Sequence, residues 1–221
     1  MTSIVLSESQ DLLWLLKPAG LSVFPRHNAP ETDCLLHRLL RERSEQKSDF
    51  PDRFEGGLLH RLDISTSGIV LAVKTPEALP RFRSLFTEKA LLKTYRFISH
   101  RSVPWDSNQV SAAIAHDKRR KRRMVVQRSP STPHRGKWYP AQTQFRRVGE
   151  TLWEATMRSG VMHQIRVHAA FVGLPLAGDP IYGGGPLREA PEGVQFALHH
   201  ARIEGPGLTP VTANLPEWWP A

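Results

Sequence analysis

The feature that most constrains this chain is an apolar run, Ile69–Val73, that directly follows the turn-forming segment Ser65–Gly68. A run of β-branched and aliphatic residues predicts a buried strand, and the small residues before it predict a tight turn. Asp63 therefore lies at a bend beside the core, where a side chain can be held rigidly and still be reached by a ligand. Taken alone, an aspartate in this place is more often a turn cap than a catalytic group.

The composition is typical of a globular protein that binds polyanions. The chain has 221 residues, 40% of them hydrophobic, which is enough for one large domain or two closely packed lobes. Thirty Lys and Arg against 21 Asp and Glu give a net charge of +9. This charge favours nucleic acid as the partner, because the sequence has no basic amphipathic helix with an aromatic face for a membrane surface.

The N-terminal segment and the cysteine content predict a cytoplasmic protein. The sequence has no run of about 18 apolar residues, and its first residues lack a basic stretch followed by a long apolar one, so a spanning helix and a signal peptide are both unexpected. The single cysteine, Cys34, cannot form an internal disulfide and is followed by Leu35 and Leu36. We expect a buried thiol in a reducing compartment.

Apolar runs and alternating segments predict mainly strands. Strands are expected over the apolar runs 12–16 and 69–73 and over the alternating segments 93–99, 138–148 and 152–157, with Gly149 and Glu150 as the turn of a hairpin. Because these strands are neighbours in sequence, we expect an α+β fold with a mostly antiparallel sheet and helices at its edges.

Helical periodicity is clear in three places. A helix with Leu35, Leu36, Leu39 and Leu40 on one face could be capped by Thr32 or Asp33. A short helix could begin at Pro80, with Phe82, Leu85 and Phe86 directed inward.

The third predicted helix begins at Met162 and ends at Gly173. Its apolar face would carry Met162, Ile165, Ala169 and Val172. His163 and Arg166 would fall together on another face, because they are three residues apart.

The segment His60–Gly68, reading HRLDISTSG, resembles the HRLDxxTSG motif of the RluA-type family of RNA pseudouridine synthases. Further blocks of the family pattern occur in the same order along the chain: Lys17–Gly20 lies before this motif, and Lys93–Tyr95, His163–His168 and Gly178–Gly183 lie after it. The resemblance implies a mixed central sheet in two lobes with a catalytic cleft between them. It also implies a single catalytic domain over residues 1–221, without the separate N-terminal RNA-binding domain that several relatives carry.

The resemblance implies that the chain isomerises uridines of structured ribosomal or transfer RNA to pseudouridine, without a cofactor. It assigns Asp63 as the essential carboxylate, Arg166 as its ion-pair partner and Tyr95 as the stacking side chain and candidate proton acceptor. A neighbouring guanidinium keeps a carboxylate ionised and oriented. A tyrosine ring offers a flat surface for a detached base.

Two sets of cations are candidates for RNA contact. By resemblance, Arg61 could insert where the flipped base was, or it could simply bind a phosphate. A run of six cations could be a mobile, solvated loop or a clamp on the RNA backbone, and it consists of Lys118, Arg119, Arg120, Lys121, Arg122 and Arg123.

The chain departs from the family pattern at Val161, where relatives usually carry an arginine. One alternative is therefore an RNA-binding protein that keeps the fold but has lost turnover. A second is a glycosidase or nuclease that uses Asp63, although the sequence shows neither a clear second carboxylate nor a metal cluster.

No metal site is expected from the histidines. His163 and His168 are five residues apart and would lie on different helix faces, and His199 and His200 have no paired Cys or carboxylate at metal-ligand spacing. We expect a monomer whose partner is RNA and which has no membrane partner.

Overall fold

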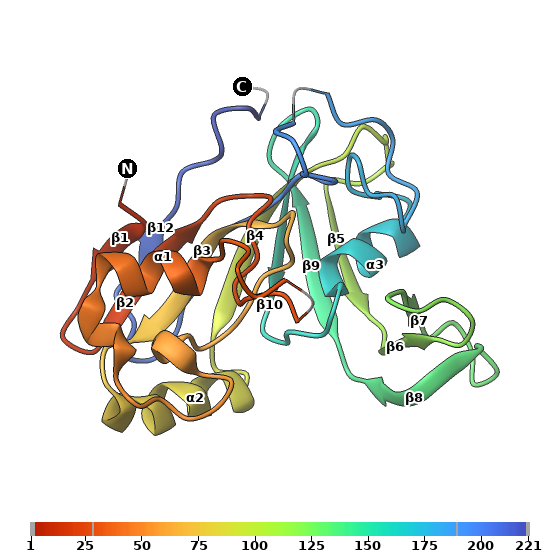
Figure 1. Ribbon diagram of the computed structural model, residues 1–221. Coiled ribbons are helices and arrows are strands. Elements are labelled where there is room, and N and C mark those ends of the chain that lie inside the picture. Colours follow the sequence, from red (N-terminus) through yellow and green to blue (C-terminus); the bar gives the residue numbers. More distant parts are fainter. Residues whose placement is uncertain (1–2, 28, 189, 220–221) are drawn as a thin grey trace. The chain divides into compact units, whose positions relative to one another are not determined.

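The computed structural model describes residues 3–27, 29–188 and 190–219 (Figure 1). The chain divides into two compact units: unit 1 comprises Met1–Leu91, Ala190–Val194 and His199–Ala221, and unit 2 comprises Leu92–Glu189 and Gln195–Leu198. Strands dominate both units, and nearly all of their pairings are antiparallel. The predicted α+β fold is confirmed.

Unit 1 is built on a sheet whose central strands were predicted. Strands β2 and β3 pair antiparallel from Leu12 opposite Val73 to Lys17 opposite Gly68, and every residue of β3 is buried. β11 lies parallel to β3, with His199 opposite Ser67. The strands of this sheet are β1 (Val5–Glu8), β2 (Leu12–Lys17), β3 (Ser67–Val73), β11 (Leu198–Glu204) and β12 (Val211–Thr212).

Helix α2 (Leu79–Thr87) covers part of this sheet. Its Phe82 packs in one apolar cluster with Trp14 of β2 and Leu71 of β3. Burying an apolar side chain of this size contributes roughly 1.5–3 kcal/mol. Pro80 stands in the first turn of the helix, so the prediction of a helix starting there with Phe82 inward is confirmed.

Helix α1 (Leu35–Glu42) has a different cap from the one predicted. The Cys34 Sγ accepts the backbone N–H of His37 at 3.4 Å, so the prediction of Thr32 or Asp33 as the cap is wrong. Asp33 instead binds the guanidinium groups of Arg38 at 2.7 Å and Arg41 at 2.9 Å. Two charge-assisted bonds satisfy that carboxylate better than one backbone N–H would. Cys34 is buried, as predicted.

Between α1 and the His60 segment the chain forms two short 3₁₀ helices, Ser44–Lys47 and Glu55–Gly57. The buried Gln46 side chain donates to the carbonyls of Gly56 at 2.7 Å and Val73 at 2.9 Å. These bonds attach the incoming segment to the end of β3, which keeps the chain entering His60 in a fixed place.

Gly68, at the start of β3, cannot be replaced without moving the backbone. Its φ is +112°, and a Cβ on it would lie 2.2 Å from the carbonyl oxygen of His200. Only glycine permits this approach, and the approach lets β11 lie beside β3. The loop that carries Asp63 therefore leads directly into the paired strands β3 and β11.

The larger sheet of unit 2 is antiparallel and ordered β4-β10-β9-β5. Its strands are β4 (Leu92–Ile98), β10 (Leu152–Met157), β9 (Gln142–Arg147) and β5 (Ser107–Ser111). β9 and β10 form the predicted hairpin around Gly149 and Glu150. Trp153 and Ala155 of β10 are buried and alternate with Glu154, as the sequence predicted.

The single strand predicted over residues 138–148 is wrong. The chain forms two strands there, β8 (His134–Tyr139) and β9, which belong to different sheets and are separated at Pro140. Proline lacks the N–H that a continuing ladder needs. β8 joins a small sheet ordered β7-β6-β8, with β6 (Ile114–Asp117) and β7 (Met124–Val126).

Helix α3 (Gln164–Phe171) is shorter than predicted at its start. His163 has a left-handed backbone with φ of +57°, which an α-helix cannot contain. Met162 therefore lies outside the helix and is 41% exposed, so its predicted place on the apolar face is wrong. Ile165 and Ala169 are buried, and the helix ends just before Gly173, whose φ is +81°, as predicted.

Within the described part of the chain, no helix is both long enough and apolar enough to cross a lipid bilayer.

Candidate active site

Asp63 lies in unit 1, in the loop that leads from His60 into β3. Its backbone carbonyl accepts the N–H of Thr66 at 3.0 Å, which closes the predicted turn. Asp63 itself is half-buried, Ser65 and Thr66 are buried, and Arg61 is exposed. The loop is thus anchored through its small residues, while Asp63 keeps partial access to solvent.

Two histidines hold the ends of this loop. His60 Nε2 accepts the backbone N–H of Leu71 at 3.1 Å, so in the neutral ring the proton lies on Nδ1. His199 Nδ1 lies 2.8 Å from the Ser67 hydroxyl. Burial lowers the pKa of His199 to about 4, and the carbonyl of Ala213 offsets this only in part. Both rings act as structural hydrogen-bonding groups.

Lys17 fixes the chain immediately after Asp63. Its fully buried Nζ donates to the carbonyls of Pro18 at 2.8 Å, Leu21 at 2.7 Å and Ile64 at 3.1 Å. The backbone N–H of Gly20 reaches the same Ile64 carbonyl at 2.9 Å. This role of Lys17 was not predicted, although the lysine lies in the Lys17–Gly20 block of the family pattern.

Burial lowers the pKa of Lys17 to about 7, and the negative charge of Asp63 acts in the opposite direction by raising it. Near neutral pH Lys17 is therefore partly in the ammonium form, which the Asp63 carboxylate favours. Lys17 supplies positive charge beside Asp63 from within unit 1.

The lowered pKa of Lys17 predicts a pH-dependent stability. In the unfolded chain a lysine has a pKa of about 10.4, so between pH 7 and pH 10 the unfolded state binds more protons than the folded state. Relative to Lys17→Met, the wild-type unfolding free energy should rise with pH by up to about 1.4 kcal/mol per pH unit. Urea unfolding of both proteins at several pH values in this window measures the slope. Parallel curves would show that Lys17 has an ordinary pKa.

Tyr95 lies in β4 of unit 2 and is buried, on the same face of the strand as Lys93 and Phe97. This alternation was predicted. Phe97 packs edge-on against Phe145 of β9 at a ring-centroid distance of 5.9 Å, which makes the strand a rigid support. Burial lowers the pKa of Lys93 to about 8. Tyr95 therefore stands beside a cation that is still charged at neutral pH.

Arg166, on α3, is buried and forms a two-pronged ion pair with Asp179. Its Nε lies 2.7 Å from Oδ2, and its Nη2 lies 3.0 Å from Oδ1. The same carboxylate accepts the backbone N–H groups of Ile181 at 3.0 Å and Tyr182 at 3.2 Å. Sequence reasoning missed Asp179 as a partner, although it lies in the Gly178–Gly183 block of the family pattern.

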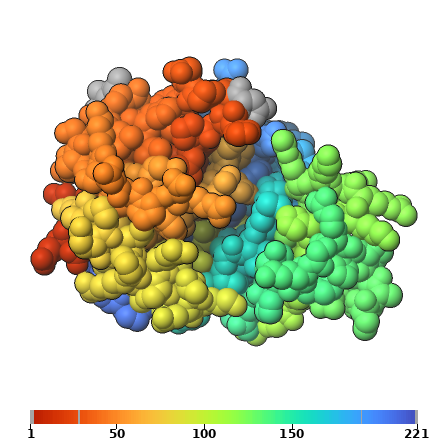
Figure 2. All heavy atoms as spheres, turned by 60° about the horizontal axis from the view of Figure 1, so that its bottom comes forward, coloured from red at the N-terminus to blue at the C-terminus, as the bar shows by residue number. Residues whose placement is uncertain are grey.

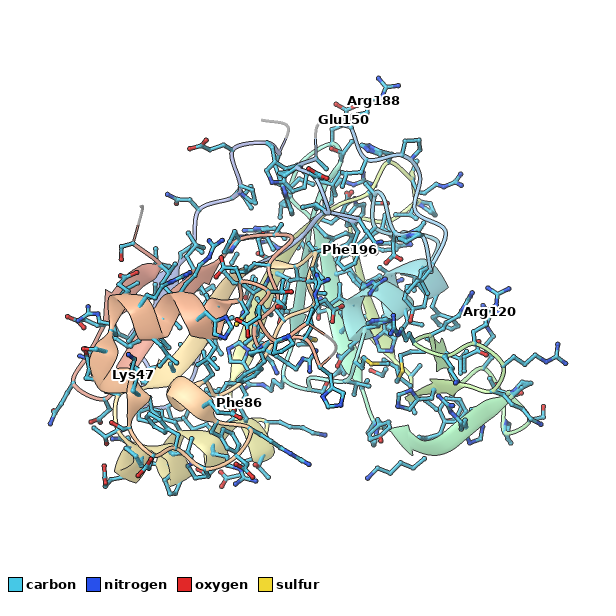
Figure 3. All side chains as sticks on the ribbon, viewed as in Figure 1. Lys47, Phe86, Arg120, Glu150, Arg188 and Phe196 are labelled. Atoms are coloured by element: carbon cyan, nitrogen blue, oxygen red, sulfur yellow. The ribbon has the colours of Figure 1, made fainter. Side chains whose placement is uncertain are left out.

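The guanidinium of Arg166 is also held between aromatic rings. Its Cζ lies 4.1 Å from the ring centroid of Phe196, labelled in Figure 3, and 5.3 Å from that of Tyr182. Asp179 takes two of the five N–H donors of an arginine. The arrangement fixes the guanidinium plane and is compatible with a second acceptor. Arg166 is therefore a buried, bound charge.

Val161 is half-buried and packs on the apolar cluster around Val167 and Tyr182. The usual arginine of the family is thus replaced here by an apolar contact. The backbone N–H of Val161 donates to the Gln164 side-chain oxygen at 3.2 Å, which keeps the start of α3 in place.

The six-cation run forms the turn between β6 and β7 in unit 2. The Asp117 Oδ1 accepts the backbone N–H groups of Arg119 at 2.8 Å and Arg120 at 2.9 Å. Burial would raise the pKa of Asp117, but these donors and the nearby arginines lower it overall. The segment Ile114–Tyr139 is green in Figure 2 and lies at the surface in that view. Five of the six cations, residues 118–122, are exposed, and Arg123 is half-buried.

The histidines predicted not to bind metal serve as hydrogen-bonding groups. His163 Nδ1 lies 3.0 Å from the Tyr182 hydroxyl, and His168 lies 2.9 Å from the Thr143 hydroxyl and 3.0 Å from the Ala112 carbonyl. Among the described residues, no three His, Cys, Asp or Glu side chains come together as a metal site.

A family model described as RNA pseudouridylate synthase matches residues 11–171. The chain is 31% identical over 182 residues to the "Uncharacterized RNA pseudouridine synthase YlyB" of Bacillus subtilis, covering 80% of this chain and 56% of that protein. It is 32% identical over 213 residues to the "Ribosomal large subunit pseudouridine synthase D" of Neisseria meningitidis, covering 90% of this chain and 53% of that protein. The chain thus spans about half the length of the curated relatives it matches.

Solved structures with a similar fold are also named as pseudouridylate synthases. The solved structure of "Human RNA Pseudouridylate Synthase Domain Containing 1" superposes with a TM-score of 0.72 at 22% identity, covering 97% of this chain and 83% of that one. The human domain-containing 4 protein gives the same TM-score at 20% identity, covering 97% and 89%. Because the family model matches well over half of the sequence and includes the Asp63 motif, the chain belongs to the RNA pseudouridylate synthase family, in its RluA-type branch.

Proposed function

We propose that this chain isomerises specific uridines of structured RNA to pseudouridine, with Asp63 as the essential carboxylate. The observation that carries the proposal is the family motif His60–Gly68 on a loop whose backbone is anchored at both ends by buried polar contacts. Ribosomal RNA is the first substrate to test, since several relatives are named for the large ribosomal subunit, and transfer RNA is the second.

The reaction breaks the N-glycosidic bond, turns the uracil and rejoins it to the ribose through carbon. No electrons are gained or lost and no group leaves, so the chemistry needs no cofactor. What it needs is a charged carboxylate at the reacting nucleotide and a flat surface for the detached base. We assign the first role to Asp63 and the second to Tyr95, whose hydroxyl could also accept the proton released from C5.

Arg166 is proposed to keep Asp63 ionised and oriented. Its two bonds to Asp179 and its stacking on Phe196 already fix its plane, which suits a group that has to present its remaining donors in one direction. In this proposal Lys17 acts on the same carboxylate from its own unit, and residues 1–221 form a single catalytic domain.

The target uridine has to leave the RNA stack to react, at a cost of a few kcal/mol that is lowest in loops. We propose that Arg61, which is exposed beside the Asp63 turn, fills the vacated space or binds the adjacent phosphate. The turn Lys118–Arg123 is proposed to hold the RNA backbone without reading sequence. We further propose that the protein acts in the cytoplasm and as a monomer.

Tritium release tests the proposal. RNA transcribed with uridine tritiated at C5 loses its label when C5 becomes the new attachment atom. We expect the wild-type chain to release tritium from ribosomal or transfer RNA, and none from the same RNA labelled at C5 of cytidine only. If tritium is released from neither ribosomal nor transfer RNA, under conditions in which the chain binds both, the result would favour the alternative of an RNA-binding protein without turnover.

A further inference from the structure

A groove of about 650 Å³ lies in unit 2, and Tyr182, whose ring contacts Arg166, forms part of its lining. The turn of the β6–β7 hairpin, the loop around Thr132 and the end of α3 line it. Its volume is within the range of small-ligand sites, which is roughly 300–1,000 Å³. The groove is therefore large enough for a nucleotide.

Cations dominate the polar lining of this groove. They are Lys118, Arg119, Arg123 and Arg128, and Asp117 is the one carboxylate among the described lining residues. That carboxylate is engaged by the turn itself, through two backbone N–H groups and the Arg123 guanidinium at 3.8 Å. Lys118, Arg119 and Arg128 are exposed. The charge of the groove is complementary to phosphate.

The apolar part of the lining includes an exposed aromatic ring. Phe171, the last residue of α3, is 38% exposed. The guanidinium of Arg128 lies 5.5 Å from the centroid of this ring, and Val167 and Ala170 of the same helix line the groove beside it. An aromatic face next to arginines is the combination on which single-stranded bases stack while their phosphates are neutralised.

We propose that this groove is a second nucleotide-binding subsite, in which an unpaired base of the substrate RNA stacks on Phe171 while Arg128 and the cations of the turn bind the flanking phosphates. The inference rests on the proposed function and extends it: the subsite takes a nucleotide other than the reacting uridine. Because stacking accepts every base, the subsite selects for unpaired loop structure and not for a particular sequence.

The test compares a fluorescently labelled RNA stem-loop with inorganic polyphosphate, a polyanion that has no bases. Phe171→Ala should raise the Kd for the stem-loop roughly 5- to 20-fold without altering its dependence on salt, and should leave polyphosphate binding unchanged. Arg128→Gln should weaken both ligands and lower the salt slope for the stem-loop by about one unit. Phe171→Trp should bind the stem-loop at least as well as wild type, which guards against loss of folding as the explanation.

Matched controls come from exposed residues outside the groove. Arg188→Gln makes the same charge change in unit 2, and Figure 3 shows Arg188 far from Arg120 of the turn. Leu6→Ala removes an apolar side chain of similar exposure, 37%. Both should bind stem-loop and polyphosphate within about twofold of wild type.

The outcomes separate this inference from the proposed function. If Phe171→Ala binds the stem-loop as wild type does, or if it weakens polyphosphate equally, base stacking in the groove is overturned and tritium release by the wild type still stands on its own. If the groove variants behave as expected but the wild type releases no tritium, the subsite stands and the isomerase proposal fails. In tritium release, Phe171→Ala should raise KM and leave kcat near wild type.

Discussion

Replacing Asp63 with Asn is expected to reduce the rate of tritium release more than about 10³-fold. The substitution keeps the size of the side chain and removes its charge, which is the property that the proposed chemistry uses. The turn should persist, because the bond that closes it runs from the Thr66 N–H to the backbone carbonyl of residue 63. RNA affinity should therefore remain near that of wild type, measured by fluorescence anisotropy with the same stem-loop.

Asp52→Asn is the matched control for this experiment. Asp52 is an exposed carboxylate in unit 1, eleven positions earlier in the chain, and its loss should leave tritium release within about twofold of wild type. Full activity in Asp63→Asn would mean that another group performs the reaction. Equal losses in both variants would mean that the effect comes from net charge and not from the site.

The Asp179→Ala variant is expected to lose roughly 3–5 kcal/mol of unfolding free energy, because it removes the buried carboxylate that binds the Arg166 guanidinium through two bonds. Arg166 is 4% exposed and the Asp179 side chain is fully buried. The backbone N–H groups of Ile181 and Tyr182 would lose their acceptor as well. Urea unfolding followed by circular dichroism and by tryptophan fluorescence measures the change.

Asp106→Ala tests whether burial or distance decides the cost. Asp106 binds the Arg147 Nε at 2.7 Å, the same distance as in the Arg166 pair, but its side chain is 86% exposed. An exposed pair contributes about 0–1 kcal/mol, so this variant should unfold close to wild type. Similar losses in the two variants would contradict the assignment of Arg166 and Asp179 as a buried structural pair.

The sequence was sufficient to predict the strands that carry strong local patterns. β3 is a continuous aliphatic run, and its burial on both faces follows from that composition. β10 alternates along its whole length and β4 alternates from Leu92 to Phe97, so their inward faces, with Tyr95 on one and Trp153 on the other, were predicted correctly. In each case the information lies within a few residues.

Predictions that depend on distant or subtle competition failed. The strand over residues 138–148 is divided at Pro140, which lacks the N–H of a continuing ladder. Its two halves pair in different sheets, which local alternation does not reveal. Cys34 caps α1 in place of Asp33, because two arginines bind the Asp33 carboxylate. Helix α3 begins at Gln164 and not at the predicted Met162, because His163 adopts a left-handed backbone. No neighbouring residue in the sequence indicates that conformation.

For the candidate site, the motif was sufficient to predict Asp63 and its turn. It did not predict the distant side chains that bind this loop and the Arg166 guanidinium. Lys17 reaches the Ile64 carbonyl across 47 positions of the sequence. Arg166 and Asp179 belong to different blocks of the family pattern, and the tertiary structure brings their side chains into contact. A charged residue in the middle of an amphipathic helix is usually exposed. The burial of Arg166 therefore could be found only from the structure.

Mapping pseudouridines in the RNA of cells that lack this chain, and of the same cells supplied with the wild-type chain or with Asp63→Asn at equal protein level, tests the central claim most directly. We predict that at least one uridine loses its pseudouridine signal without the chain, regains it with the wild type and does not regain it with Asp63→Asn. Restoration by Asp63→Asn, or an unchanged pseudouridine map when the chain is missing, would contradict the account.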